Sequence, residues 1–510
     1  MMILARSALS FLMALLLSGV ARAGDRPNIL VILTDDMGFS DLGCFGGEIE
    51  TPNLDSLAAG GLRFTEFYNT ARCWPTRATL LSGRYSNKLT AEQVTIPEVL
   101  EGAGYETGMV GKWHLGNDPK KNGPVQRGFD RFYGTLAGAN SYWNPESLTR
   151  DTKFVKPEGK DYYYTDQIGL EAAEQIAGFA KSQKPFFQYV AFTAGHWPLH
   201  APEATIQKYL GRYQAGWEKL RQERYARMIK TGVIDRERWP LPAPEKRVED
   251  WETIDHKAWR IRNQAIYAAM VDHMDQAVGK MITALKASGQ FENTLIVYAH
   301  DNGACAEHLS GNAWNTANLV LKNAREAGKK TAVGDVYEVP MGGPFTFGSV
   351  GHNWANAQNT PMRRYKANVH NGGACTPAIM HWPAGMKAKP GSISPGRGHV
   401  VDVMATSLEL AEAKYPASFA GNAIKPHESH SLVPVLAGGP GDRDHPYLFN
   451  HSGTHAVVKG DYKIVREGKG DWALYNLAKE RTEITDLAGE HPEIVAGLTK
   501  IWEARWGKQE

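Results

Sequence analysis

Residues 28–36 read NILVILTDD, a short apolar run that ends directly at two adjacent acidic residues. A run dominated by Ile, Leu and Val is typical of a strand that is buried on both faces of a sheet. Similar runs alternate with longer amphipathic stretches, and residues 265–285 have the apolar spacing of a helix. This alternation predicts an α/β fold with a largely parallel sheet. The further predicted strands are residues 107–110, 185–192, 294–298 and 376–381.

Oxygen-bearing side chains follow two of these strands. Asp35 and Asp36 come after the first, and Asp301 and Asn302 come soon after the strand at 294–298. In open α/β sheets the ligand crevice lies outside the carboxyl ends of the strands, so these side chains are expected to meet. Carboxylate and amide oxygens suit Ca²⁺ or Mg²⁺ better than zinc, and adjacent buried carboxylates repel unless a cation neutralises them. The alternative, that they are helix caps and turn residues, explains one pair more easily than two.

The segment CWPTRATLLSGR, from Cys73 to Arg84, predicts a helix that begins at the cysteine. Pro75 suits the first turn, and Gly83 suits the position just after the last turn. Cys73 is then at the helix N-terminus, where free N–H groups favour an anion, and Arg77 shares its face four residues on. A nucleophile beside a planar cation suits a tetrahedral oxyanion. A buried structural cysteine beside a surface arginine is the open alternative.

Basic residues near other predicted strand ends complete the candidate site. Lys112 and His114 are two residues apart in an extended segment, so both can enter one pocket. His196 follows the strand at 185–192, and Lys366 comes just before the turn-like residues 371–373. Taken singly, a lysine or histidine is more often solvated or structural.

The bulk composition restricts the classes of partner. The chain has 510 residues, a formal net charge of +2 and 22% charged residues, and no basic tract indicates nucleic-acid binding. Four cysteines are too few for a disulfide framework in a chain of this size. If Cys73 serves in chemistry, at most one pair can form among Cys44, Cys305 and Cys375.

The N-terminus has the parts of a secretory signal peptide, residues 1–23. Arg6 precedes an apolar run at 10–20, and Ala21-Arg22-Ala23 forms a small-x-small cleavage site. The apolar run is shorter than a membrane span. We therefore expect an exported protein, periplasmic or secreted, with no membrane span after cleavage. An uncleaved anchor is the alternative.

The remaining sequence predicts a large domain over residues 24–420 and a small α+β subdomain over 421–510. Pro and Gly cluster from about residue 416 to 446, where the residue composition changes. Strand-like runs at 454–459 and 462–465 and a helical stretch at 492–506 follow. Within the large domain, residues 201–262 and 308–360 look like insertions, and long insertions are often functional.

Several of these segments together resemble the type I, formylglycine-dependent sulfatases. Residues 73–84 resemble the Cys-x-Pro-x-Arg signature of that family, and residues 104–116, GYETGMVGKWHLG, resemble its second signature. The resemblance extends from about Arg26 to the C-terminus and is closest to bacterial arylsulfatase-like members. It implies the alkaline phosphatase-like fold, with a mixed, mostly parallel central sheet, flanking helices and a small C-terminal sheet. The other segments that match in order are residues 27–38, 51–55, 301–303, 365–366, 370–373 and 376–377.

The resemblance also implies roles for the candidate residues. A separate maturing enzyme would oxidise Cys73 to formylglycine, whose hydrated aldehyde attacks sulfur. Arg77 would orient this nucleophile, Lys112 would bind sulfate oxygens and His114 would remove a proton so that sulfate is expelled. His196 and Lys366 would lie on the leaving-group side. One Ca²⁺ ion, rather than Mg²⁺, would be held by Asp35, Asp36, Asp301, Asn302 and the modified Cys73.

The sequence departs from the commonest family pattern at Thr76, Asn371 and Cys375, and the last two put the local pocket wall in doubt. A phosphate or phosphonate monoester hydrolase of the same superfamily remains an alternative function, as does a non-catalytic glycan-binding protein on this scaffold. The expected substrate is a sulfated carbohydrate or an aryl sulfate, with the former favoured for an exported enzyme. Candidate contacts to the leaving group are Asn140, Ser141, Trp143, His352, Trp354 and His370.

Overall fold

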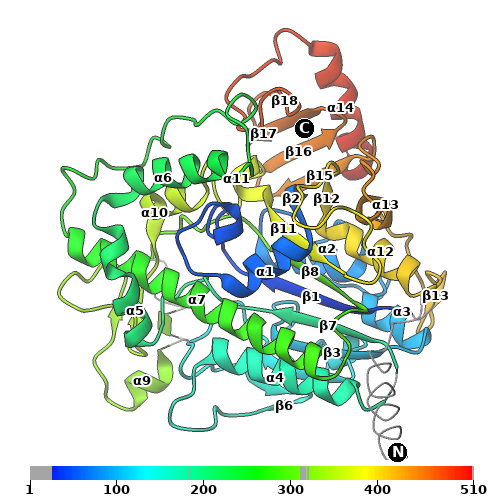
Figure 1. Cartoon of the computed structure of the whole chain (residues 1–510), viewed down its shortest axis with the longest axis horizontal. Helices are drawn as coiled ribbons and strands as arrows, with labels where there is room; N and C mark the ends of the chain where they lie inside the picture. The colour runs from blue at the N-terminus through cyan, green and yellow to red at the C-terminus, as the bar shows by residue number, and fades with distance from the viewer. Residues whose placement is uncertain (1–25, 183, 310–316, 319–320, 508–510) are drawn as a thin grey trace, which may run out of the picture.

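The computed structural model describes residues 26–182, 184–309, 317–318 and 321–507 (Figure 1). The predicted signal peptide, residues 1–23, lies outside this range. A ten-stranded sheet forms the centre, with the strand order β12-β2-β11-β8-β1-β7-β3-β4-β5-β6. Its strands are β1 (Asn28–Thr34), β2 (Leu62–Tyr68), β3 (Glu106–Lys112), β4 (Arg131–Thr135), β5 (Leu148–Arg150), β6 (Lys153–Phe154), β7 (Phe186–Ala191), β8 (Thr294–His300), β11 (Cys375–His381) and β12 (Gly398–His399).

The five strands predicted from the sequence are all present in this sheet, as β1, β3, β7, β8 and β11. Strand β1 pairs in parallel with β7 and β8, and β3 pairs in parallel with β4 and β7. Strand β11 is antiparallel to both of its neighbours, β2 and β8. The prediction of a mixed, mostly parallel sheet is therefore confirmed.

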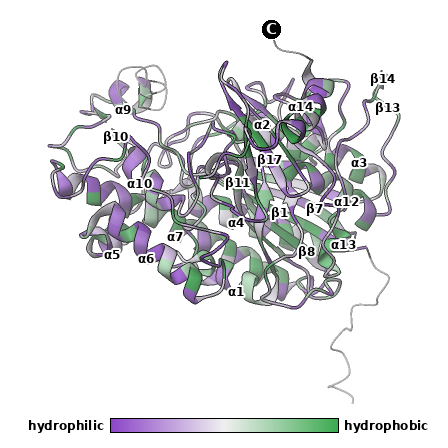
Figure 2. Cartoon of the chain, turned by 90° about the horizontal axis from the view of Figure 1, so that it is seen from above, coloured by the Kyte–Doolittle hydropathy of each residue, from purple (hydrophilic) through white to green (hydrophobic). Residues whose placement is uncertain are grey.

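Alternate residues of β1 enter two different cores, which explains why the whole run is apolar. Leu30 and Ile32 pack in the core that contains α1, α4 and α7, whereas Ile29, Val31 and Leu33 pack in the core that contains α2, α3 and α12. Helices thus cover both faces, and Figure 2 shows hydrophobic residues gathered around the central strands. The bounds of these helices are α1 (Pro52–Gly60), α2 (Cys73–Ser82), α3 (Ile96–Gly102), α4 (Tyr164–Phe179), α7 (Lys257–Ala287) and α12 (Val403–Leu410).

Helix α7 contains the predicted helix at 265–285, and its methionines Met270, Met274 and Met281 are buried core residues. The two apparent insertions also contain regular structure: α5 (Glu203–Tyr209), α6 (Gly216–Lys230), α9 (Lys322–Glu326), β9 (Ala332–Val333), β10 (Thr346–Phe347) and α10 (Gly351–Gln358). Short elements elsewhere are α11 (Asn371–Ala374), β13 (Ser418–Phe419), β14 (Asn422–Ala423) and α13 (Val433–Leu436).

The C-terminal region forms a separate antiparallel sheet, seen at the top of Figure 1. Its strands are β15 (Tyr447–His451), β16 (Thr454–Lys459), β17 (Tyr462–Glu467) and β18 (Ala473–Asn476), and α14 (Pro492–Trp506) packs against them. Trp502 of α14 is buried and donates a hydrogen bond to the carbonyl of Phe449 in β15 (3.0 Å). The predicted small α+β unit is thus present, and the boundary at residue 420 stays a prediction. Among the helices of the described residues, none is long and apolar enough to cross a membrane.

Candidate active site

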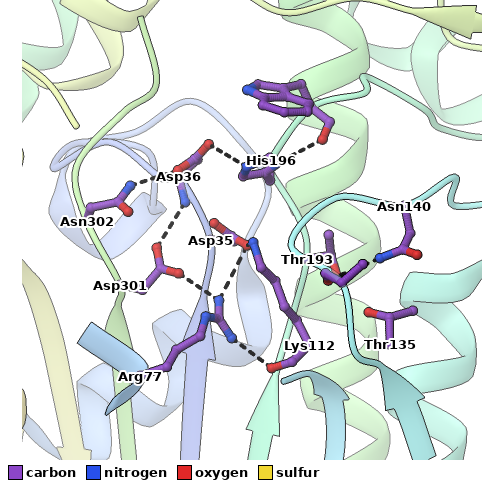
Figure 3. Close-up of polar contacts among 12 residues, drawn as sticks. Asp35, Asp36, Arg77, Lys112, Thr135, Asn140, Thr193, His196, Asp301 and Asn302 are labelled. Carbon is purple, nitrogen blue, oxygen red and sulfur yellow. Dashed lines mark hydrogen bonds and ion pairs between the residues drawn. The ribbon is translucent and has the colours of Figure 1, made fainter. Parts of the chain in front are cut away.

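The predicted site residues come together where β1, β3, β7 and β8 end at one edge of the sheet (Figure 3). Asp35 and Asp36 follow β1, and Asp301 and Asn302 follow β8. Lys112 is the last residue of β3, and His196 follows β7 by a few residues. The expectation that parallel strand ends would gather these side chains is therefore met by the geometry.

Helix α2 carries Cys73 and Arg77 into the same place. It begins at Cys73, as its sequence predicted, and ends before Gly83, whose φ of +63° is the left-handed conformation that favours glycine. The Sγ atom of Cys73 and carboxylate oxygens of Asp35 and Asp301 lie within 4.8 Å of one another. The Thr76 hydroxyl donates to the Asp301 carbonyl (2.7 Å), which fastens the first turn of α2 to the end of β8. All four cysteines are free thiols in this structure.

Arg77 and Lys112 neutralise Asp35 and Asp301. Arg77 Nη2 donates to Asp301 Oδ2 (2.6 Å) and Asp35 Oδ2 (3.3 Å), and Nη1 donates to the Lys112 carbonyl (3.0 Å). Lys112 Nζ donates to Asp35 Oδ2 (2.5 Å; Figure 3), and all four side chains are fully buried. Because Arg77 meets three acceptors and Lys112 holds Asp35 from a second side, this half of the site is rigidly held.

Asp36 is the centre of the other half. Its Oδ1 accepts a hydrogen bond from Asn302 Nδ2 (2.8 Å), and its Oδ2 accepts one from Lys366 Nζ (2.8 Å). His196 Nε2 lies 3.6 Å from the same Oδ2. Asp36 has a φ of +58°, which is unusual for a residue other than glycine and turns the chain sharply after β1. Lys366, from a segment distant in sequence, thus joins the predicted set.

The charges of the site fit a bound cation. Burial, with the neighbouring Asp301 carboxylate, raises the pKa of Asp35 to about 7 despite its contacts with Lys112 and Arg77. Asp35 Oδ1 and Asn302 Oδ1 are buried and have no hydrogen-bond partner among the described residues. Unsatisfied buried oxygens are costly, and several hard oxygen donors directed at one place are what Ca²⁺ or Mg²⁺ requires. The residues present therefore fit a hard divalent cation.

The two histidines of the site are held in the neutral form. Burial lowers the pKa of His114 well below its ordinary value, and the nearby Lys112 and Arg77 charges lower it further. Burial likewise lowers the pKa of His196, together with Lys366 and Lys112. The His114 ring packs against Gly138, where a Cβ would lie 2.3 Å from Nε2. Neutral imidazoles near neutral pH can accept protons.

Glu307 is a neighbour of the site that the sequence reasoning missed. Its carboxylate accepts hydrogen bonds from Arg72 Nη1 and from Trp197 Nε1, both at 2.8 Å, and lies 3.5 Å from Lys366 Nζ. These partners come from three segments far apart in sequence. No local sequence pattern around Glu307 indicates that it lies beside the site, so its position is evident only from the folded structure.

Not all expected leaving-group contacts are available in the structure. Trp354 was placed by the sequence in a Gly- and Asn-rich loop, but it lies in α10 and packs in the core against Trp217 and Trp251. His370 is buried and bonded to Asn368. These two expectations are wrong, because the Trp354 ring is used in packing and both ring nitrogens of His370 have partners, Asn368 and Tyr475. The others have local partners: the side chain of Asn140 bonds within its own loop, Ser141 accepts from the backbone of residues 143 and 144, Trp143 packs on Tyr163, and His352 lies 4.0 Å from Glu249.

Comparison with known proteins places this architecture in a family. The family model described as Sulfatase matches residues 27–413. An uncharacterized sulfatase of Schizosaccharomyces pombe is 32% identical, over 94% of this chain and 93% of that protein. An arylsulfatase of Klebsiella aerogenes is also 32% identical, over 84% of this chain and 94% of its own. The solved structure of Ps i-CgsB in complex with k-i-k-neocarrahexaose shares the fold, with a TM-score of 0.66 and 23% identity over 95% of this chain and 93% of that one.

The family match covers most of the chain, and two relatives of this identity align with nearly their whole lengths. The chain therefore belongs to the sulfatase family and is a sulfatase, an enzyme that hydrolyses sulfate esters.

Proposed function

We propose that this sulfatase cleaves sulfate monoesters with a nucleophile made from Cys73 beside a Ca²⁺ ion held by Asp35, Asp36, Asp301 and Asn302. The observation that carries the proposal is the meeting of the buried Asp35 and Asp301 carboxylates at the Cys73 thiol, with Asp36 beside Asp35 and with Asp35 Oδ1 and Asn302 Oδ1 left without hydrogen-bond partners among the described residues. Mg²⁺ is less favoured, because it demands near-ideal octahedral geometry and keeps several waters. When bound, the ion would make the site positive and polarise the sulfate group.

Cys73 is proposed to act after conversion to formylglycine by a separate maturing enzyme. Burial raises the pKa of the Cys73 thiol, so the unmodified residue is a poor nucleophile at neutral pH. A hydrated aldehyde at position 73 would offer one hydroxyl to attack sulfur and a second to drive the release of sulfate. Arg77, one helical turn further along α2, would keep residue 73 oriented through its contacts with Asp301 and Asp35.

The balance of charge supports an anionic substrate. Asp35, Asp36 and Asp301 are paired with Arg77, Lys112 and Lys366, so the buried side chains are already close to neutral together. A divalent cation added to this set would make the site positive, and a buried positive site attracts an anion strongly. Lys112 is then proposed to bind sulfate oxygens.

The proton transfers are assigned to the remaining basic residues. His114, neutral because burial lowers its pKa, would accept the proton of the second hydroxyl of residue 73. Lys366 keeps its charge: burial opposes it, but Asp36 and other neighbours raise its pKa well above the ordinary value. Lys366 and His196 share Asp36 Oδ2, and one of them would protonate the departing oxygen.

A sulfated carbohydrate is the proposed substrate class. N-acetylgalactosamine-6-sulfatase of Homo sapiens is 27% identical over 87% of this chain and 72% of its own length. A fold neighbour with 20% identity and a TM-score of 0.63 was solved in complex with D-glucosamine-2-N,6-O-disulfate. The signal-like residues 1–23 support export to the periplasm or the medium, where such polysaccharides occur.

Matched sulfate and phosphate esters, assayed on one formylglycine-containing preparation, test the proposal. A sulfate monoester carries one negative charge and a phosphate monoester nearly two at neutral pH, and a site with one divalent metal suits the lower charge. We expect kcat/KM for the sulfate to exceed that for the phosphate. A clear preference for phosphate monoesters or diesters would favour the phosphohydrolase alternative instead.

A further inference from the structure

The carboxylate of Glu307 lies at a junction beside the active site, in the loop that follows β8. Its Oε1 accepts a hydrogen bond from Arg72 Nη1 (2.8 Å), and its Oε2 accepts one from Trp197 Nε1 (2.8 Å). The same Oε2 is 3.5 Å from Lys366 Nζ and 3.4 Å from Cys305 Sγ. One charged donor, Arg72, and one neutral donor, Trp197, thus fix the carboxylate beside the lysine.

The donors that fix Glu307 adjoin residues of the proposed mechanism. Arg72 immediately precedes Cys73, and its guanidinium lies over the Trp74 ring, 5.2 Å from the centroid. Trp197 immediately follows His196, and the centres of their rings are 4.3 Å apart. The carboxylate is therefore held by the two segments that also present the nucleophile and the leaving-group histidine. These two contacts fix the position of the Glu307 carboxylate relative to Cys73 and His196.

Lys366 lies between two carboxylates. Its Nζ is 2.8 Å from Asp36 Oδ2 and 3.5 Å from Glu307 Oε2, and its side chain is 1% exposed, whereas that of Glu307 is 33% exposed. Asp36 is a proposed metal ligand. If Asp36 were the lysine's only anionic neighbour, Coulomb attraction would draw the ammonium toward the metal site. A second carboxylate on the solvent-facing side opposes that movement.

We propose that Glu307 is a positioning residue, which holds the ammonium of Lys366 toward the leaving-group oxygen instead of letting it pair with Asp36 alone. This inference rests on the proposed function, in which Lys366 acts on the leaving-group side. The pKa of Glu307 supports an ionised side chain: burial opposes the charge, but Lys366 and Arg72 lower the pKa to about 2. No proton moves to or from Glu307 in this role.

Glu307→Gln tests the role, because it keeps the size and the acceptor oxygen but removes the charge. A proton donor matters most for a poor leaving group and least for an activated phenol. We expect kcat/KM for phenyl sulfate to fall about tenfold or more, part of the roughly 10²–10⁴ that a proton donor contributes, with a much smaller loss for 4-nitrophenyl sulfate. Equal losses on the two substrates, or no loss on either, would overturn the proposal.

Glu428→Gln is the matched control, since Glu428 also pairs with an arginine (Arg505, 2.6 Å) and is 21% exposed, but lies away from the site. It should leave the ratio of the two substrates unchanged. A double-mutant cycle adds a second condition. In a Lys366→Ala background, Glu307→Gln should change kcat/KM for phenyl sulfate by less than about twofold. Independent, multiplying losses would mean that Glu307 does not act through Lys366, and would overturn the proposal.

Crystal structures of the wild type and Glu307→Gln give a readout that does not depend on turnover. We expect the 3.5 Å separation between Lys366 Nζ and the side chain of residue 307 to lengthen in the variant, while the 2.8 Å contact with Asp36 is kept and α2 and β8 are unchanged. An unmoved Lys366 would contradict the positioning role. If the formylglycine-containing wild type hydrolyses neither these aryl sulfates nor sulfated carbohydrates, the proposed function fails, and the position of Lys366 in the two crystal structures still decides the role of Glu307.

Discussion

Two clusters of buried charged residues each include an aspartate from the segment just after β1. They differ in how many of their polar atoms have a hydrogen-bond partner. The catalytic cluster consists of Asp35, Asp36, Asp301, Arg77, Lys112 and Lys366. The Arg224 cluster consists of Arg224, Asp41, Glu48, Tyr213 and Tyr267. In it, Arg224 donates to Asp41 Oδ1 (2.6 Å) and to both oxygens of Glu48 (2.7 and 2.8 Å), and the two tyrosines donate to the same carboxylates.

Burial does not distinguish the two clusters, because Arg77 and Arg224 are both fully buried. The two clusters differ instead in whether their buried polar atoms have hydrogen-bond partners. Within the described residues, no side-chain nitrogen or oxygen of the Arg224 cluster lacks a partner, whereas Asp35 Oδ1, Arg77 Nε and the adjacent Asn302 Oδ1 do. A complete network of hydrogen bonds stiffens a fold. An incomplete one costs stability, and proteins retain such networks mainly at functional sites. We therefore expect mutations in the first cluster to remove activity and mutations in the second to remove stability.

The largest expected effect is that of Cys73→Ala at the catalytic cluster. If the residue supplies the nucleophile, as proposed, kcat/KM for an aryl sulfate should fall by more than about 10⁴-fold. The melting temperature should change little, since the thiol makes no ion pair. Cys44→Ala, at a cysteine away from the site, is the control and should stay active. A fully active wild type whose peptide spectrum shows an unmodified Cys73 thiol would refute the assignment.

Arg224→Met should show the opposite behaviour. It leaves Asp41 buried without its cation and Glu48 with only the more distant Arg227 (3.5 Å), which costs about 3–5 kcal/mol of unfolding free energy. Urea denaturation measures this loss, and turnover per folded molecule should stay within about twofold of the wild type. Arg212→Met, at a more exposed arginine paired with Glu50, is the control and should cost less than about 1 kcal/mol. A stable but inactive Arg224→Met protein would remove the distinction between the clusters.

Metal removal should affect the catalytic cluster alone. Ca²⁺ added to chelator-treated wild type at about 100 times its Kd should stabilise the fold by about 2.7 kcal/mol, because the ion binds only the folded state. Asp301→Ala should lose this thermal shift, whereas the Arg224→Met protein should keep it. Stoichiometric zinc in the active enzyme, or an Asp301→Ala variant that retains both metal and activity, would speak against the site.

A third buried acidic site, Asp402, sharpens the comparison because among the described residues it has hydrogen-bond donors but no cation. It accepts hydrogen bonds from the backbone of His399 and His430 and from the Tyr447 hydroxyl. Burial raises its pKa from 3.8 to about 7, so the folded protein favours the protonated form. As the pH rises from about 4 to 7, the wild type should therefore lose stability relative to Asp402→Asn, by about 4 kcal/mol in all. Melting temperatures of both proteins across this range measure the difference, and a constant difference would contradict the raised pKa.

The sequence was sufficient for the features that depend on local signals. The apolar run at 28–33 predicted β1, and the acidic residues after it predicted one side of the site, because parallel strands bring their carboxyl ends together. Proline near the start and glycine after the end predicted the limits of α2. These signals are contained within a dozen residues, so no knowledge of the partner segments was needed.

Features that depend on distant partners could not be predicted in this way. The pattern at 376–381 indicates a strand but not its direction, and β11 is antiparallel to its neighbours. Trp354 lies among Gly and Asn residues that suggested a loop, yet Trp217 and Trp251 from another insertion complete a core around it. Glu307 was missed for the same reason, since Arg72, Trp197 and Lys366 acquire their common neighbour only when the chain folds.

The burial of Cys73 indicates when the proposed modification would take place relative to folding. In the folded protein its side chain is 2% exposed, within the first turn of a helix that Thr76 fastens to the end of β8. A maturing enzyme must surround the residue that it oxidises, and it cannot do so at such a position. The conversion would therefore belong to the newly made chain, before α2 docks. A maturing enzyme should then modify the denatured chain and leave the folded one untouched, so protein that folds too early would remain permanently inactive.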